Sequence, residues 1–137
     1  MSAIKSKDTK PEVYIRKLLF SHGYRYRKYA KQIPGHPDIW MKKYNTAIFV
    51  NGCFWHRHNG CKYAYTPKTD TEFWNMKFEN NIKRDLAIKE KLRDKQIRCL
   101  VVWECTIRKT FKNTELQKDL IETLIFFLRS DIQYMEI

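Results

Sequence analysis

The sequence is poor in residues that break or link structure. It contains only 4 glycines and 4 prolines in 137 residues, with no internal repeat, low-complexity run or Gly/Ser-rich linker, so we expect one continuous domain over residues 1–137. No segment approaches the roughly 18 apolar residues that cross a bilayer, and the first residues lack the apolar core of a signal peptide. These absences predict a cytoplasmic protein without a membrane partner.

Acidic residues are scarce relative to basic ones. The 15 Asp and Glu stand against 27 Lys and Arg, which gives a formal net charge of +12. Such an excess favours a polyanionic partner, above all a nucleic acid, and the alternative is a basic surface without a specific ligand. Lys5 and Lys7 are candidates for phosphate contacts, although a basic residue on a basic protein is usually only solvated.

The pattern of apolar and turn-forming residues predicts a mixed α/β fold with helices around a small central sheet. Thr9-Lys10-Pro11-Glu12 has the order of residues that starts a helix, which we expect to run from about Lys10 to His22. The alternation in Tyr24–Arg27 predicts a half-exposed strand. The remaining predicted elements are the two strands of a core hairpin (38–41 and 47–50), a long amphipathic helix (71–95), a buried strand (97–103) and a last helix (113–129).

Residues 52–71 are rich in Cys, His, Tyr and Gly and follow neither a helical nor a strand period. This composition predicts an irregular loop that something other than burial must order. Cys53, His58 and Cys61 lie within nine residues, and Cys105 comes just after the buried strand. Three thiolates and one imidazole form the donor set of a closed, structural zinc site that would pin the loop to the strand end.

The alternative is that Cys53 and Cys105 are buried thiols and that the loop histidines are solvated. Cys99 lies inside an apolar strand, where cysteine usually acts as a small hydrophobic residue, so we leave it out of the proposed zinc site.

Groups that can catalyse a metal-assisted hydrolysis gather around the expected hairpin. Asp38 opens its first strand, and the second strand ends at Val50-Asn51, so a carboxylate and backbone oxygens can meet there, as a hard divalent cation requires. His56 follows at the edge of the same segment and can act as a general base. Glu12 can add a second carboxylate if the first helix packs over the hairpin.

Each of these residues also has an ordinary explanation. Asp38 follows a proline and suits a turn, Glu12 suits the reciprocal half of a helix capping box, and an exposed histidine such as His56 needs no special role. The aromatic pair Phe54-Trp55 has two interpretations as well, because flat side chains beside the chemistry can open a base stack or can pack in a core.

Five separated blocks of the sequence resemble the very short patch repair (Vsr) endonuclease family. They occur in the family's order over roughly residues 1–105 and are Ile4–Glu12, Pro34–Asp38, Phe49–His58, Glu72–Trp74 and Val102–Cys105.

The resemblance implies a restriction-endonuclease-like α/β fold with a zinc-bound loop. It also implies Mg²⁺-dependent hydrolysis of one phosphodiester 5′ to the T of a T:G mismatch, which arises by deamination of 5-methylcytosine. The expected partner is mismatched double-stranded DNA in the nucleoid of a bacterial cell. We expect a monomer, with mismatch-repair proteins as further partners.

By position, the resemblance makes Asp38 a ligand of the catalytic metal and the Val50 backbone carbonyl a second ligand. His56 is then the group that activates or orients water, and Asp85 is similar to an Asp that supports this histidine. Glu12 becomes an accessory acidic residue.

The same resemblance matches Cys53, His58, Cys61 and Cys105 to the family's zinc ligands, in agreement with their spacing. It matches Phe54 and Trp55 to residues inserted beside the mismatch, and Met1 to a methionine that enters from the other groove. Trp74 can extend this apolar platform, although its helical spacing favours core burial equally.

The chain departs from the family at two places. It starts at the wedge methionine, so we expect a shortened N-terminal arm and weaker DNA binding. Asn51 stands where better-known members have a histidine near the scissile phosphate. Asparagine can donate a hydrogen bond to a phosphate oxygen, but it cannot shuttle a proton.

These departures keep two alternative functions open. One is a restriction-type DNA endonuclease of the same fold with another recognition site. The other is a zinc-stabilised DNA-binding module that has lost catalysis and binds DNA in a salt-dependent way.

Overall fold

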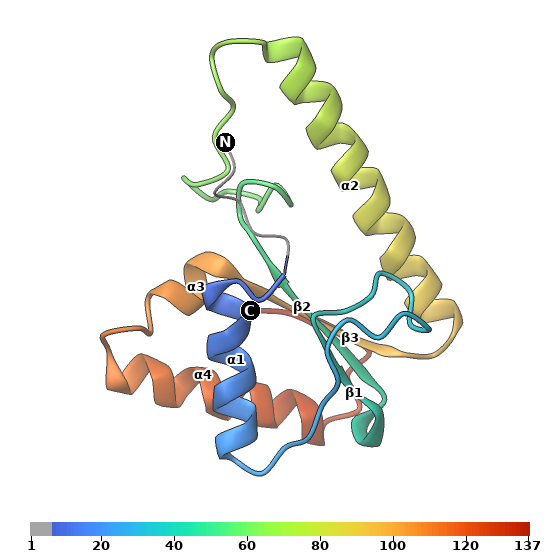
Figure 1. Cartoon of the computed structure of the whole chain (residues 1–137), viewed down its shortest axis with the longest axis vertical. Coiled ribbons are helices and arrows are strands. Elements are labelled where there is room, and N and C mark those ends of the chain that lie inside the picture. Colours follow the sequence, from blue (N-terminus) through green and yellow to red (C-terminus); the bar gives the residue numbers. More distant parts are fainter. Residues whose placement is uncertain (1–6) are drawn as a thin grey trace.

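A computed structural model describes residues 7–137 (Figure 1). The elements follow one another as α1 (Lys10–Ser21), β1 (Ile39–Met41), the 3₁₀ helix η1 (Lys42–Tyr44), β2 (Thr46–Asn51), α2 (Thr71–Asp94), β3 (Arg98–Trp103), α3 (Glu104–Arg108), α4 (Thr114–Arg129) and β4 (Tyr134–Glu136).

The four strands form one mixed sheet in the order β1-β2-β3-β4. β1 and β2 are antiparallel, with Ile39 opposite Ile48, and η1 makes their short connection, which closes on Asn45 in the left-handed conformation. β2 and β3 are parallel, as are β3 and β4. A parallel pair needs a long crossover connection, and α2 and α4 supply the two crossovers.

Helix α1 begins as its sequence predicts. Thr9 and Glu12 form a capping box, and Pro11 occupies the first turn, where its missing N–H removes no helical hydrogen bond. The helix ends at Ser21, and Gly23 follows with φ +88°. The predicted helix is therefore confirmed to within one residue of its end.

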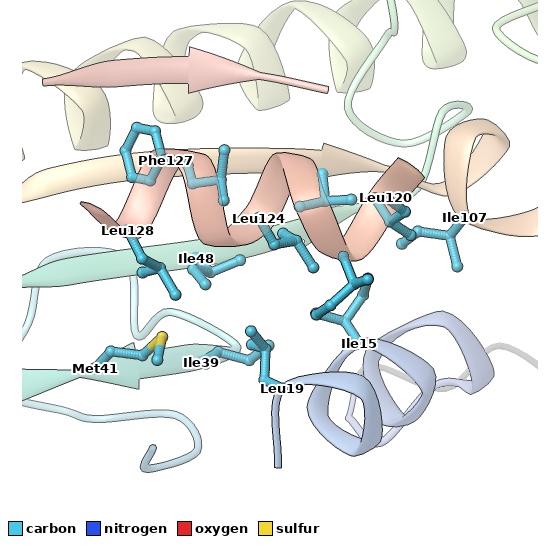
Figure 2. Packing of buried hydrophobic residues seen from close by; sticks show 13 residues of the cluster. Ile15, Leu19, Ile39, Met41, Ile48, Ile107, Leu120, Leu124, Phe127 and Leu128 are labelled. Atoms are coloured by element: carbon cyan, nitrogen blue, oxygen red, sulfur yellow. The ribbon is translucent and has the colours of Figure 1, made fainter. Parts of the chain in front are cut away.

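One face of the sheet packs against α1 and α4 (Figure 2). The close-up shows Ile15 and Leu19 of α1 and Leu124 of α4 meeting over Ile39 and Ile48 of the sheet, and each of these side chains has no exposed surface. Burying a side chain of this size contributes about 1.5–3 kcal/mol. This face is the main core, and it fixes where α1 lies relative to β1 and β2.

The other face of the sheet is covered by only part of α2. Ile88 and Leu92, near its C-terminal end, pack with Ala47, Cys99 and Val101. A helix of 24 residues is about 36 Å long, whereas a six-residue strand spans only about 20 Å. The N-terminal part of α2 therefore extends beyond the sheet, as Figure 1 shows.

The predicted helix over 71–95 is confirmed as α2 (Thr71–Asp94), but several of its apolar side chains are not covered. Phe73, Met76, Ile82 and Leu86 are exposed, and the buried side chains of α2 are Phe78, Asn81 and Leu92. The apolar residues have helical spacing, but the sheet is too short to cover them.

The predicted strand at Tyr24–Arg27 is also wrong. Arg27 alone forms a β-bridge, exchanging backbone hydrogen bonds of 2.9 and 2.8 Å with Trp40. The chain then turns, with Tyr29 at φ +51°, and cannot continue as an edge strand. The short elements α3 and β4 were not predicted from the sequence.

The predicted fold class is confirmed as a mixed α/β architecture with helices on both faces of a small sheet. Among residues 7–137, no helix combines the length and the apolar character needed to span a membrane.

Candidate active site and metal centre

Two carboxyl groups lie together at the end of β2. Asp38 directly precedes β1, and its Oδ2 accepts a hydrogen bond of 2.7 Å from the backbone N–H of Val50. Burial, followed by the neighbouring Glu12 carboxylate, raises the pKa of Asp38 to about 8. Packing of α1 against the hairpin thus brings Glu12 and Asp38 together, which was the condition for Glu12 to add a second carboxylate.

Glu12 is held in its charged form by several donors. Thr9 donates to Glu12 Oε2 from its backbone N–H at 3.0 Å and from its hydroxyl at 2.6 Å, and the Tyr29 hydroxyl donates to Oε1 at 2.7 Å. Arg16 Nη2 lies 3.3 Å from Oε1. Burial opposes ionisation, but the hydrogen bonds from Thr9 and Tyr29 outweigh it and lower the pKa of Glu12. Glu12 is therefore both a capping residue and a neighbour of Asp38.

The donor set at this corner suits a hard divalent cation. In an antiparallel pair, the N–H and C=O of one residue face the same neighbouring strand, so the Val50 carbonyl faces the side on which its N–H meets Asp38. Two carboxyl groups and a backbone carbonyl are oxygen ligands of the kind that Mg²⁺ uses. The raised pKa of Asp38 fits as well, because two adjacent carboxylates need a proton or a cation between them.

His56 lies on the side of the sheet that faces α2. Its Nδ1 is 2.7 Å from Oδ2 of Asp85 on α2, and their side chains are 28% and 31% exposed. Both residues line a cavity of about 800 Å³ together with Asn51. An ionised carboxylate can only accept a hydrogen bond, so the imidazole nitrogen that faces it must carry a proton. Asp85 therefore favours the tautomer with the proton on Nδ1, which leaves Nε2 free to accept a proton.

The cysteine and histidine residues named from their spacing do meet. The Sγ atoms of Cys53, Cys61 and Cys105 and a ring nitrogen of His58 all lie within 4.8 Å of one another. His58 Nδ1 is 3.6 Å from Cys53 Sγ and 3.5 Å from Cys105 Sγ. A tetrahedral zinc ion with usual bond lengths separates S and N ligands by about 3.6 Å. The cluster can therefore hold a metal ion.

The histidine of this cluster is oriented by its surroundings. Its ring stacks on Trp103 at the end of β3, with centroids 4.1 Å apart and planes 6° from parallel. Cys105 follows in α3, so the cluster joins the loop after β2 to the end of β3. Cys99 is buried inside β3 and packs in the core, outside the cluster, as predicted.

Phe54 and Trp55 form part of an aromatic cluster between the loop and α2. The Phe54 ring lies 5.0 Å from Trp55, 5.7 Å from Trp74 and 5.2 Å from Phe78. Phe78 is buried, whereas Phe54, Trp55 and Trp74 are half-buried. The three half-buried rings therefore keep part of their surface available to a partner.

This aromatic cluster is held by polar side chains that were not predicted from the sequence. Arg57 donates to the backbone carbonyls of Phe54, Ala64 and Tyr65, and Asn81 of α2 donates to the Trp55 carbonyl at 3.1 Å. An arginine in a basic sequence gives no signal of such a role. The role of Asn81 on α2 cannot be predicted from the sequence either, because helical spacing does not show which polar residue the fold buries.

The remaining predicted DNA contacts are not part of this cluster. Lys7 is exposed, and its ammonium lies 5.4 Å from the centre of the Tyr29 ring. Met1 and Lys5 lie outside the described residues.

Comparisons with known proteins agree with the geometry. The family model of the DNA mismatch endonuclease Vsr matches residues 1–62. The chain is 41% identical over 125 residues to the type II nicking enzyme V.NmeAIP of Neisseria meningitidis serogroup A, across 91% of this chain and 86% of that enzyme. It is 38% identical over 115 residues to the DNA mismatch endonuclease Vsr of Escherichia coli K12, across 84% and 73%. The chain belongs to the Vsr DNA mismatch endonuclease family.

A third relative has a similar level of sequence identity. The type II nicking enzyme V.XorIIP of Xanthomonas oryzae pv. oryzae is 41% identical over 107 residues, which is 78% of each chain. Membership of the Vsr family identifies the four-stranded sheet and its helices as a restriction-endonuclease-like fold. The family resemblance seen in the sequence is thereby confirmed.

We expect Asp38→Asn to stabilise the protein in a pH-dependent way. The folded-state pKa of Asp38 is raised to about 8, so its contribution to stability is complete below pH ~4 and is lost as the pH rises to ~8. Asparagine keeps the acceptor for Val50 and has no proton to lose. Because the shift covers about four pKa units of about 1.4 kcal/mol each, the gain at pH 8 should be on the order of 5 kcal/mol.

The measurement is urea unfolding of both proteins at pH 4, 6 and 8 without added divalent cations. Equal differences at all three pH values would contradict the raised pKa.

We expect Cys105→Ser to lower the metal content and the thermal stability together, because it removes one of four ligands that join two parts of the chain. Elemental analysis and a melting curve of the purified protein measure both effects. Cys99→Ser is the matched control, and it should keep the metal even if core packing suffers. Full metal content in Cys105→Ser would remove this residue from the metal site.

Proposed function

We propose that this chain is a DNA endonuclease that cuts one strand 5′ to the T of a T:G mismatch and so begins very short patch repair. The observation that carries the proposal is the Asp38–Glu12 carboxyl pair at the end of β2, beside Val50. Its Vsr relatives include a DNA mismatch endonuclease and type II nicking enzymes. The proposed site of action is bacterial DNA in the cytoplasm, where the protein acts as a monomer.

In the proposed mechanism, Asp38 and the Val50 carbonyl hold the catalytic cation, and Glu12 is an accessory acid. Mg²⁺ bound there would supply Lewis-acid stabilisation of the charge that develops on the phosphate. The residues prepare this corner in advance, because Val50 fixes Asp38, while Thr9 and Tyr29 fix Glu12. Little reorganisation is then needed when the phosphate arrives.

His56 acts as the general base of the reaction. Its Nε2 takes a proton from the attacking water as the new P–O bond forms and the bond to the leaving oxygen breaks. Asp85 supports this role because its hydrogen bond to Nδ1 sets the tautomer and stabilises the imidazolium that results. Asn51, which lines the same cavity, can donate a hydrogen bond to a phosphate oxygen.

Mismatch selection rests on Phe54 and Trp55, with Trp74 behind them. A T:G pair stacks and pairs less well than a normal pair, so wedging an aromatic ring beside it costs less. The half-buried rings, in the loop that directly follows β2, support this assignment. Lys7 and the net charge of +12 support sequence-independent attraction to the backbone, and Met1 and Lys5 are assigned to DNA only from the family resemblance.

The structural metal is assigned as zinc, held by Cys53, His58, Cys61 and Cys105. The support is the chemistry of the donors, since three thiolates and an imidazole suit zinc and leave no open position for catalysis. The ion would keep the loop that carries Phe54 and Trp55 at the end of β3.

We expect the wild-type protein to nick an end-labelled duplex with one T:G mismatch in a CT(A/T)GG context, only on the strand with the T and only when Mg²⁺ is added. The C:G duplex of the same sequence is the control. Asp38→Ala should reduce nicking by at least a thousandfold while mismatch binding and zinc content persist, because it removes one ligand of the catalytic cation.

Two other outcomes would reject the proposal in different ways. Binding without a cut would indicate a DNA-binding module without catalysis. Equal cutting of both duplexes would indicate an endonuclease with another specificity.

We expect Asn51→His to increase the single-turnover rate at neutral pH by about tenfold or more, since a histidine at this position can protonate the leaving oxygen and asparagine cannot. The rates of both proteins from pH 5.5 to 8.5 measure the effect, with Asn51→Gln as a control for side-chain size. An unchanged rate would show that protonation at this position is not limiting.

A further inference from the structure

Arg57 occupies an unusual place in the loop between β2 and α2. Its backbone adopts φ +53°, which non-glycine residues use rarely, and its side chain is half-buried. It carries a charge in a segment that already holds a candidate metal cluster. A charged side chain placed this way needs hydrogen bonds that compensate for lost water.

The guanidinium of Arg57 joins two stretches of the loop. Nη1 donates to the carbonyls of Phe54 at 3.1 Å and Tyr65 at 3.0 Å, and Nη2 donates to the carbonyl of Ala64 at 2.8 Å. These bonds tie the residues after β2 to the residues before α2. The metal cluster joins the loop to β3 and α3 instead, so Arg57 restrains a part of the loop that the cluster does not hold.

Arg57 also packs directly on the aromatic cluster. Its Cζ lies 3.7 Å from the centre of the Phe78 ring and 5.6 Å from that of Phe54. Phe78 is a buried residue of α2, so the guanidinium is held between α2 and the backbone carbonyl of Phe54. A planar guanidinium can stack on a ring and fill several hydrogen bonds at once, which an ammonium group cannot do.

We propose that Arg57 is a positioning residue that holds Phe54 and Trp55 in place for insertion beside a mismatched base pair and thereby sets the preference for mismatched over paired DNA. This inference rests on the proposed function. Without Arg57, the Phe54 and Tyr65 carbonyls lose their shared donor, and the rings of Phe54 and Phe78 lose the guanidinium that packs on them. The aromatic pair would then have to be reordered during binding, which lowers the affinity for the mismatch.

The test compares Arg57→Lys and Arg57→Ala with Lys62→Ala. Arg57→Lys keeps the charge and loses the planar fork, and Lys62→Ala removes an exposed charge from the same loop. Fluorescence anisotropy gives the Kd for a T:G duplex and for its C:G counterpart. We expect the ratio of the Kd for the C:G duplex to the Kd for the T:G duplex to fall about tenfold in both Arg57 variants. Lys62→Ala should keep the ratio, because charge alone acts on both duplexes equally.

A second measurement needs no DNA. Of the four tryptophans, Trp40 and Trp103 are buried, so acrylamide mainly quenches Trp55 and Trp74. We expect stronger quenching in both Arg57 variants than in the wild type, with unchanged zinc content. If Arg57→Lys keeps the wild-type mismatch preference or the wild-type quenching constant, the inference is overturned. Loss of zinc would also overturn it, because Arg57 would then support the metal cluster.

The two proposals can fail separately. A wild-type protein without any mismatch preference would reject the proposed function, and the quenching measurement would then decide alone whether Arg57 positions the aromatic pair.

Discussion

The main constraint on the proposed site is the close approach of two carboxyl groups, Asp38 and Glu12, at one corner of the sheet. Such an approach is unfavourable, and burial together with the Glu12 carboxylate raises the pKa of Asp38 to about 8. It persists because neither group can move away. Asp38 is tied to the backbone of Val50, and Glu12 caps the helix that carries it. The core between α1, α4 and the sheet supplies the stability that offsets this strain, so the best-packed part of the molecule directly supports the proposed catalytic corner.

The other functional groups follow from the position of β2. This strand is paired on both sides, and the seven residues from Val50 to His56 contain a backbone ligand candidate, a metal-site cysteine, the aromatic pair and the candidate base. A central strand gives such a segment a fixed starting point, and the irregular loop after it lets side chains point in different directions. Hydrolysis, metal binding and base-pair sensing can therefore share one short stretch of chain.

Some of this arrangement could be predicted from the sequence, where local rules apply. The capping box at Thr9 and Glu12 and the Cys/His spacing are signals that depend on few residues, and both agree with the structure. Predictions that depend on tertiary partners were less successful. The exposed apolar side chains of α2 have helical periodicity, but periodicity does not reveal that the sheet ends before they are covered. The role of Arg57 depends on carbonyl groups that only the folded loop brings together.

The protruding half of α2 has a consequence for how the molecule fluctuates. Its N-terminal turns pack on the loop after β2, whereas Leu92 and its neighbours pack on the sheet. A segment with few buried contacts can open locally at a free-energy cost below that of global unfolding. We therefore expect the outer part of α2 and the loop after β2 to form a less rigid unit than the sheet and its main core. The outer unit can loosen, exchange its amide hydrogens and accumulate substitutions while the carboxyl pair stays folded beneath it.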